Sequence, residues 1–168
     1  MKPPAPPTGQ RRRRIAFFFD DYVDTAARVL EIGPGDGWLG AYLVHSGFLG
    51  YRRIDRAPPA DIVGDVRSWR ELGLAAESFD IVIAFDVLQR LDCLTEAYDL
   101  LAPGGYLFVV APVPGRERWA RWLGALGLRR RPPAPPTRRV GFEDLRCFRE
   151  VGRRIGLLEQ WWKLRKPL

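Results

Sequence analysis

Three glycines alternate directly behind a short apolar run near the start of the chain. Residues 29–32 are apolar apart from Glu31, and Gly33, Gly35 and Gly37 follow before the next apolar segment. Glycines between a buried strand and a helix let the backbone turn tightly, and they let a ligand approach without a Cβ in the way. The pattern therefore predicts a strand, a ligand-binding loop and a helix, in that order.

Strand-like and helix-like segments alternate along the 168-residue chain, which has the length of one domain. This alternation predicts an α/β fold with a mostly parallel sheet and helices on both faces, in which ligands bind at the carboxyl ends of the strands. The expected strands are 28–32, 50–54, 61–64, 79–85, 106–111 and 157–164, and the expected helices are 15–27, 38–46, 91–101 and 142–155.

We expect the C-terminal edge of the sheet to be reduced. The connection 56–60, between the second and third expected strands, is too short for a helix. Beyond the fifth expected strand, only residues 157–164 have the pattern of a strand. A second strand that would complete this edge is then either missing or supplied by a partner chain. Trp161 and Trp162 alternate on the last expected strand, and an exposed tryptophan at a sheet edge would favour a homodimer through that strand.

Two segments differ from the rest in composition. Residues 1–14 are rich in proline and arginine and are expected to form a disordered tail, so that one domain spans 15–168. The segment 129–139 (RRRPPAPPTRR) is expected to be an exposed, extended linker within that domain. No apolar run reaches the roughly 20 residues of a membrane-spanning helix and none suits a secretory signal, so we expect a cytoplasmic protein.

The net charge of +7 is unevenly distributed. Residues 15–111 carry more acidic than basic side chains, whereas residues 1–14 and 112–168 are strongly basic. Basic ends attract RNA, phospholipid headgroups or anionic substrates, but an arginine-rich composition produces the same pattern without any such partner. Because the chain has two cysteines and one histidine, a disulfide framework and an ordinary zinc site are both excluded.

The acid at the end of the second expected strand narrows the class of ligand. A carboxylate at Asp55 can accept both hydroxyls of a ribose. The dinucleotide fingerprint G-x-G-x-x-G fails when it starts at Gly33, because Trp38 occupies the third glycine position. A nucleoside ligand without a pyrophosphate fits this loop better.

Five segments together resemble the class I S-adenosylmethionine-dependent methyltransferases, and most closely their type 11 group. The loop 31–37 (EIGPGDG) is similar to the family's motif I, and Pro103, Gly104 and Gly105 are similar to its turn before the fifth strand. The resemblance implies a Rossmann-like fold, S-adenosylmethionine as cofactor and methyl transfer as activity. The similar segments are 31–37, 51–55, 61–66, 78–88 and 101–107.

The resemblance assigns the glycine loop to the methionine part of the cofactor. Gly33, Gly35 and Gly37 would line that part, with Glu31 in the preceding strand. Asp36 fits either a turn residue or a ligand contact.

The strand ends are assigned to the rest of the cofactor on the same ground. Asp55 would hold the ribose, and Asp65 and Val66 would flank the adenine. Phe85 and Asp86 would lie beside the sulfonium and the amino-acid end. Asp86 fits equally well as a cap of the following helix.

The chain departs from the family after its fourth strand. Many relatives have a Glu-His pair where Gln89 and Arg90 stand, so no catalytic base is indicated there. Methyl transfer from an activated sulfonium can proceed by positioning, and a base is needed only if the acceptor must lose a proton. The expected activity is methyl transfer to a small-molecule or lipid-like acceptor. Two alternatives are a non-catalytic, methyltransferase-like subunit acting through a protein partner, and a nicotinamide-dependent oxidoreductase, against which the failed fingerprint argues.

Few other residues offer chemistry. His45 follows the loop by about two helical turns and is expected to have a structural or surface role. Tyr22 is expected to be a core aromatic or a cover over the ligand. Cys93 and Cys147 lie too far from the strand ends to serve as the nucleophile that cytosine methylation requires.

Overall fold

The computed structural model describes residues 7, 9–20, 24–88, 91–113 and 142–168. Within these residues, the helices are α1 (Gly9–Phe19), α2 (Trp38–His45) and α3 (Leu94–Leu100), and the 3₁₀ turns are η1 (Val66–Ser68) and η2 (Phe142–Leu145). The strands are β1 (Val29–Ile32), β2 (Tyr51–Asp55), β3 (Ile62–Val63), β4 (Phe79–Phe85), β5 (Leu101–Pro112), β6 (Arg149–Ile155) and β7 (Glu159–Arg165).

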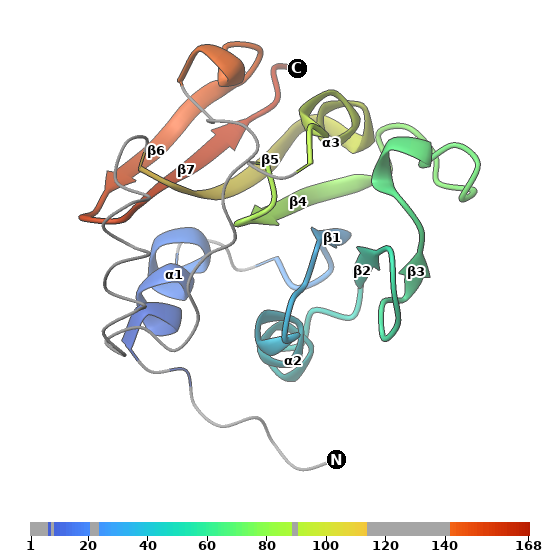
Figure 1. Ribbon diagram of the computed structural model, residues 1–168, viewed down its shortest axis with the longest axis horizontal. Coiled ribbons are helices and arrows are strands. Elements are labelled where there is room, and N and C mark those ends of the chain that lie inside the picture. The colour runs from blue at the N-terminus through green and yellow to red at the C-terminus, as the bar shows by residue number, and fades with distance from the viewer. Residues whose placement is uncertain (1–6, 8, 21–23, 89–90, 114–141) are drawn as a thin grey trace.

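The strands form one sheet in the order β3-β2-β1-β4-β5-β7-β6 (Figure 1). The sheet is parallel from β3 to β5, and β7 lies antiparallel between β5 and β6. Because β1 pairs with β2 on one side and β4 on the other, the direction of strand addition reverses at β1, where ligands bind in such sheets. The predicted α/β fold with a mostly parallel sheet is confirmed, and the connection 56–61 contains no helix.

Helices cover both faces of the sheet (Figure 1). On one face, Phe18 of α1 and Leu43 of α2 share a buried cluster with Phe108 of β5. On the other face, Leu100 of α3 shares a second buried cluster with Val82 of β4. Burial on both sides explains why β4 is an almost continuous apolar run. In the part of the chain that the structure describes, no helix is long and apolar enough to cross a membrane.

The C-terminal edge of the sheet is complete, so the expectation of a reduced edge is wrong. Residues 142–155, expected to be a helix, form η2 and β6 instead. The buried apolar residues of this segment, Leu145 and Phe148, precede β6, whose own residues are mostly charged and exposed. An exposed, largely charged edge strand lacks the alternation of apolar and polar residues that would have identified it.

Strand β7 is an inner strand, with both of its hydrogen-bonding sides occupied by neighbours. Trp161 and Trp162 are both buried on it. The expected route to a homodimer, through an edge strand at 157–164, therefore loses its structural basis. The strand that forms this edge of the sheet is β6.

Helix α1 begins at Gly9, whereas the sequence predicted a disordered tail over 1–14 and a helix over 15–27. The helix extends into the arginine run because Arg14 is partly buried there and Ile15 and Phe18 are buried against the sheet. Tyr22, and the linker expected at 129–139, lie outside the described residues. The other predicted strands and helices are confirmed, with their ends shifted by a few residues.

Candidate functional site

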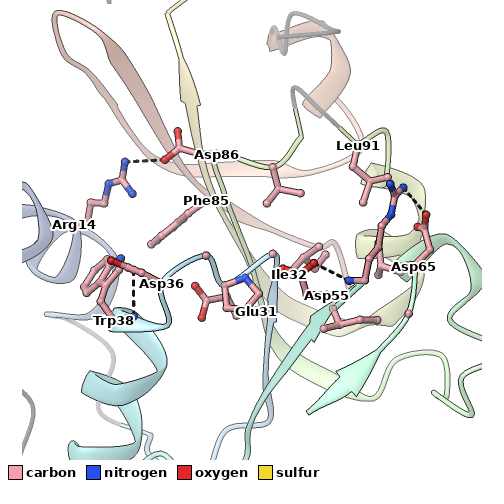
Figure 2. Close-up of a pocket in the computed structure, with 18 residues that line it drawn as sticks. Arg14, Glu31, Ile32, Asp36, Trp38, Asp55, Asp65, Phe85, Asp86 and Leu91 are labelled. Carbon is pink, nitrogen blue, oxygen red and sulfur yellow. Dashed lines mark hydrogen bonds and ion pairs between the residues drawn. The ribbon is translucent and has the colours of Figure 1, made fainter. Parts of the chain in front are cut away.

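A cavity of about 540 Å³ opens at the carboxyl ends of β1, β2, β3 and β4 (Figure 2). Small-molecule sites commonly measure about 300–1,000 Å³, so this cavity has a suitable size. Gly37 lines an adjoining pocket of about 160 Å³. The other nine residues predicted to contact the cofactor all line the main cavity, namely Glu31, Gly33, Gly35, Asp36, Asp55, Asp65, Val66, Phe85 and Asp86.

The cavity has two polar ends with the glycine loop between them (Figure 2). Asp55 and Asp65 lie at one end, close to Leu91, and Arg14 and Asp86 lie at the other. A ligand that spans the cavity would therefore meet carboxylates at one end and an arginine–aspartate pair at the other.

The backbone of the loop requires glycine at three positions. Gly33, Gly35 and Gly37 have φ angles of 65°, 59° and 69°, a backbone conformation that residues other than glycine rarely adopt. A Cβ at Gly33 would lie 2.7 Å from the Val87 side chain, whereas one at Gly35 would meet no heavy atom within 4 Å. A Cβ at Gly33 would thus displace Val87, whereas a Cβ at Gly35 would meet open space.

Beneath the loop, Glu31 is buried in β1 and accepts a hydrogen bond from the hydroxyl of Tyr51. Burial raises the pKa of Glu31 to about 7, although this hydrogen bond and the charge of Arg53 favour the ionised form. Gly40 makes room for the tyrosine, because a Cβ there would lie 2.4 Å from its hydroxyl oxygen. Gly40 therefore makes room for the side chain that supports Glu31, rather than for a ligand.

At one end of the cavity, the carboxylates of Asp55 and Asp65 differ in how many hydrogen bonds they already accept. Asp55 accepts a hydrogen bond from the backbone N–H of Arg56 at 2.7 Å. Asp65 is an acceptor for two arginine side chains, Arg56 and Arg67, and these hydrogen bonds hold its pKa well below the usual range. Asp55 thus has more capacity left for a ligand than Asp65.

At the other end, Arg14 joins three elements of the fold. Its guanidinium lies 3.1 Å from Asp86 at the end of β4 and 2.9 Å from Glu159 at the start of β7. It also lies over the ring of Phe85, with 5.4 Å between the guanidinium carbon and the ring centre. Burial alone would raise the pKa of Glu159, but the charge and hydrogen bonds of Arg14 outweigh it and lower the pKa.

The structure excludes one of the two roles predicted for Asp86. Helix α3 begins only at Leu94, with Cys93 as its N-cap, so Asp86 does not cap it. Asp86 has a φ of 58° and lines the cavity. Strained backbone of this kind is concentrated at functional sites.

Asp36 makes the predicted turn contact and also lines the cavity. Its carboxylate lies 3.5 Å from the backbone nitrogen of Trp38, as in a weak turn contact, and it lines the cavity. It also pairs with Arg11 of α1, whose guanidinium lies over the Trp38 ring. Helix α1 therefore reaches the glycine loop as well as the end of β4.

The remaining candidates lie away from the cavity wall. His45 is exposed in the last turn of α2. Cys93 is fully buried, and burial raises the pKa of its thiol to about 12, whereas Cys147 is exposed. Among the described residues, no group of three metal-ligating side chains gathers.

Sequence reasoning missed several residues of the cavity wall. Arg14 lies in the segment expected to be a tail, and no motif marks it. Arg56 directly follows Asp55, and this adjacency is the one signal that could have identified it. Trp38, Val87 and Leu91 add apolar surface to the wall.

The chain matches the family model described as a methyltransferase domain over residues 8–157. The chain belongs to this family. None of the curated proteins compared with this methyltransferase domain matches it.

Solved structures with the same fold include several methyltransferases. One is an S-adenosylmethionine-dependent methyltransferase from Methanosarcina mazei, with 17% identity and a TM-score of 0.64, covering 88% of this chain and 96% of the other. Another comes from Archaeoglobus fulgidus, with 14% identity, a TM-score of 0.62 and coverages of 92% and 90%. A third belongs to a complex of the Haloferax volcanii Trm112 methyltransferase activator with a methyltransferase, with 15% identity, a TM-score of 0.68 and coverages of 94% and 88%. At these identities the likeness shows the fold.

S-adenosylmethionine is the cofactor of this methyltransferase family, and the cavity suits it. Gly35 lines the cavity and has open space around its Cα, so a ligand can approach its backbone closely. Asp55 supplies a carboxylate at the end of β2, the position from which an acid can accept ribose hydroxyls. The residues present therefore fit the cofactor.

Proposed function

We propose that this methyltransferase domain binds S-adenosylmethionine in the main cavity and transfers its methyl group to a small-molecule or lipid-like acceptor. The observation that carries the proposal is the meeting of the open glycine loop at Gly35 with the carboxylate of Asp55 in one cavity. The glycine loop would follow the methionine part of the cofactor, and Asp55 would hold the ribose.

The remaining wall residues complete this assignment. Gly33 and Gly37 would shape the loop, with Glu31 beneath it. Asp65 and Val66 would lie beside the adenine end. Asp36, Phe85 and Asp86 would lie beside the amino-acid end. Arg14 joins the second group, because it lines the cavity and contacts both Asp86 and Phe85.

The bound cofactor supplies an activated methyl group, so the chain contributes chiefly by positioning. Arg14 holds Asp86 and Phe85 in fixed places at the end of β4. Holding both reactants in line removes much of the entropic barrier of a displacement reaction. A separate base is needed only for an acceptor that must lose a proton.

Apolar wall residues support an acceptor with apolar character. Trp38, Phe85, Val87 and Leu91 contribute side chains to the same cavity. The alternative function is a methyltransferase-like subunit that acts through a protein partner. It is favoured by one related fold having been solved in a complex with a methyltransferase activator.

Calorimetric titration with S-adenosylmethionine and S-adenosylhomocysteine tests the proposal. We expect micromolar binding by the intact chain and a loss of at least about tenfold in Asp55→Ala, because a ribose hydroxyl pair loses its acceptor. Asp20→Ala, which changes an exposed carboxylate at the end of α1, is the matched control and should bind like the unchanged chain.

Three results would argue against the proposal in different ways. Equal affinity in Asp55→Ala would remove the assigned site. An absence of binding by the folded chain would favour the partner-dependent subunit. Binding without methyl transfer to any added small-molecule or lipid acceptor would leave the cofactor site intact and overturn the acceptor class.

A further inference from the structure

Four hydrogen-bond donors surround the carboxylate of Asp65. Its Oδ1 accepts from the backbone N–H and the Nε of Arg67, at 3.1 and 3.0 Å. Its Oδ2 accepts from a terminal nitrogen of Arg67 at 2.6 Å and from a terminal nitrogen of Arg56 at 2.7 Å. A carboxylate offers about four lone-pair positions, so these donors use its full capacity.

This saturation conflicts with the role that the resemblance implies for Asp65. An adenine amine donates hydrogen bonds, and it needs an acceptor that has a lone pair free. Asp65 is doubly paired with arginines and also caps η1, so replacing a donor would break a charge-assisted hydrogen bond. Charge-assisted bonds are roughly twice as strong as neutral ones, so an adenine amine is a poor competitor.

Arg56 is placed to contact the purine in its stead. It lines the cavity, while Arg67, which binds the same carboxylate, does not. Arg56 begins the short connection from β2 to β3, where the structure has no helix to cover the strand ends. Its side chain is 63% exposed, so one edge of the guanidinium is held by Asp65 while much of its surface remains accessible.

A guanidinium has the right chemistry for a purine. It is planar and stacks on aromatic rings, and nucleic-acid bases are commonly stacked on arginine in this way. It is also a donor only, so it can serve the ring nitrogens of a purine but cannot accept from an amine.

We propose that Arg56, held in place by Asp65, is the polar residue that contacts the purine of the cofactor, and that Asp65 positions Arg56 instead of binding the adenine amine. This inference rests on the proposed binding of S-adenosylmethionine in the cavity. With Arg56 as the contact, binding does not depend on the exocyclic amine of the purine.

The test compares two nucleosides by calorimetry. S-adenosylhomocysteine carries the amine, and S-inosylhomocysteine carries a keto oxygen in its place. We expect the unchanged chain to bind both within about threefold, because no buried acceptor is left facing the keto oxygen. In Arg56→Ala, affinity for S-adenosylhomocysteine should fall about tenfold as the stacking contact is lost.

Two further variants separate the contact from the charge. Arg56→Lys keeps the positive charge but loses the planar guanidinium, so its affinity should resemble that of Arg56→Ala. Arg70→Ala is the control, because this exposed arginine pairs with Asp99 and does not line the cavity, and it should bind S-adenosylhomocysteine like the unchanged chain. Arg56 is exposed, so its variants should fold.

The outcomes distinguish the inference from the function on which it rests. A preference of more than about threefold for the amine in the unchanged chain would assign adenine recognition to an acceptor such as Asp65 and overturn the inference. Undiminished affinity in Arg56→Ala would also overturn it. Failure of the unchanged chain to bind either compound would overturn the proposed function itself.

Discussion

The guanidinium of Arg14 lies 2.9 Å from the carboxylate of Glu159, so α1 and β7 meet at the rim of the cavity. The two side chains are only 11% and 8% exposed, which makes this a buried ion pair. Removing one partner of such a pair leaves the other charge buried without compensation. The stability of the fold and the shape of the site therefore depend on the same contact.

Arg14→Met should lower the free energy of unfolding by about 2–4 kcal/mol, because Glu159 then remains buried without its cation. Urea denaturation followed by circular dichroism measures this change. Arg13→Met, which changes an exposed neighbour on the same helix, should alter stability by less than about 0.5 kcal/mol. Equal effects of the two variants would show that the ion pair contributes nothing specific.

Glu31 should make stability depend on pH in a defined direction. Its pKa is about 7 in the folded chain, raised from 4.5, so between these values the folded state holds a proton that the unfolded state releases. The contribution of Glu31 to stability is then fully present below pH 4.5 and is lost as the pH rises through 7.

Comparing the unchanged chain with Glu31→Gln isolates this contribution. Between pH 4.5 and pH 7.5, the unchanged chain should lose about 1–3 kcal/mol of unfolding free energy relative to Glu31→Gln. Guanidinium titrations at several pH values provide the measurement. Parallel pH profiles for the two proteins would mean that Glu31 titrates normally.

Alanine at two glycines of the loop should have different effects. Gly33→Ala should destabilise the fold by about 2–4 kcal/mol, because it combines a positive φ with a Cβ 2.7 Å from Val87. The double variant Gly33→Ala/Val87→Ala should recover only the steric part of this loss. Thermal denaturation of the unchanged chain, the single variant and the double variant measures the backbone and the steric components. An equal loss of stability in the single and double variants would show that the fold relieves the clash with Val87 without cost.

Gly35→Ala should lose only about 1–2 kcal/mol of stability, since its Cβ meets no protein atom within 4 Å. Gly35 lines the cavity, and the added Cβ would occupy open space at this position, so binding of S-adenosylhomocysteine should weaken by at least about tenfold. Calorimetry and thermal denaturation on one preparation separate the two effects. Unimpaired binding would place the ligand away from this part of the loop.

The two cysteines should differ in reactivity towards a thiol reagent. Cys147 is exposed, whereas Cys93 is fully buried with a thiol pKa of about 12. In the native protein one thiol should react, and the second should react only after denaturation. Cys147→Ser should abolish the native reaction. A rapid reaction of both thiols in native protein would contradict the burial of Cys93.

The glycine loop and the acids at the strand ends could be predicted because local sequence determines them. Gly33 and Gly35 are required by positive φ angles. Asp55 ends β2 and Asp65 closely follows β3, and the carboxyl ends of these parallel strands meet at one edge of the sheet. A pattern within a few residues is sufficient for such predictions.

The parts that the sequence did not reveal depend on contacts between distant segments. Arg14 belongs to an arginine run that reads as a tail, and its role becomes visible only where Asp86 and Glu159 meet it. Strand β6 escaped prediction for a local reason, because its residues are mostly charged and exposed and show no alternation of apolar and polar side chains.

The position of β7 between β5 and β6 has a consequence for synthesis of the chain. A nascent chain that ends before Glu159 already contains β5, including the buried residues Phe108 and Val110, but lacks the strand that pairs with its free side. Exposed apolar strands with an unpaired edge are prone to aggregate. Until residue 165 has left the ribosome, this half of the sheet stays open, and folding there must wait for the β6–β7 hairpin.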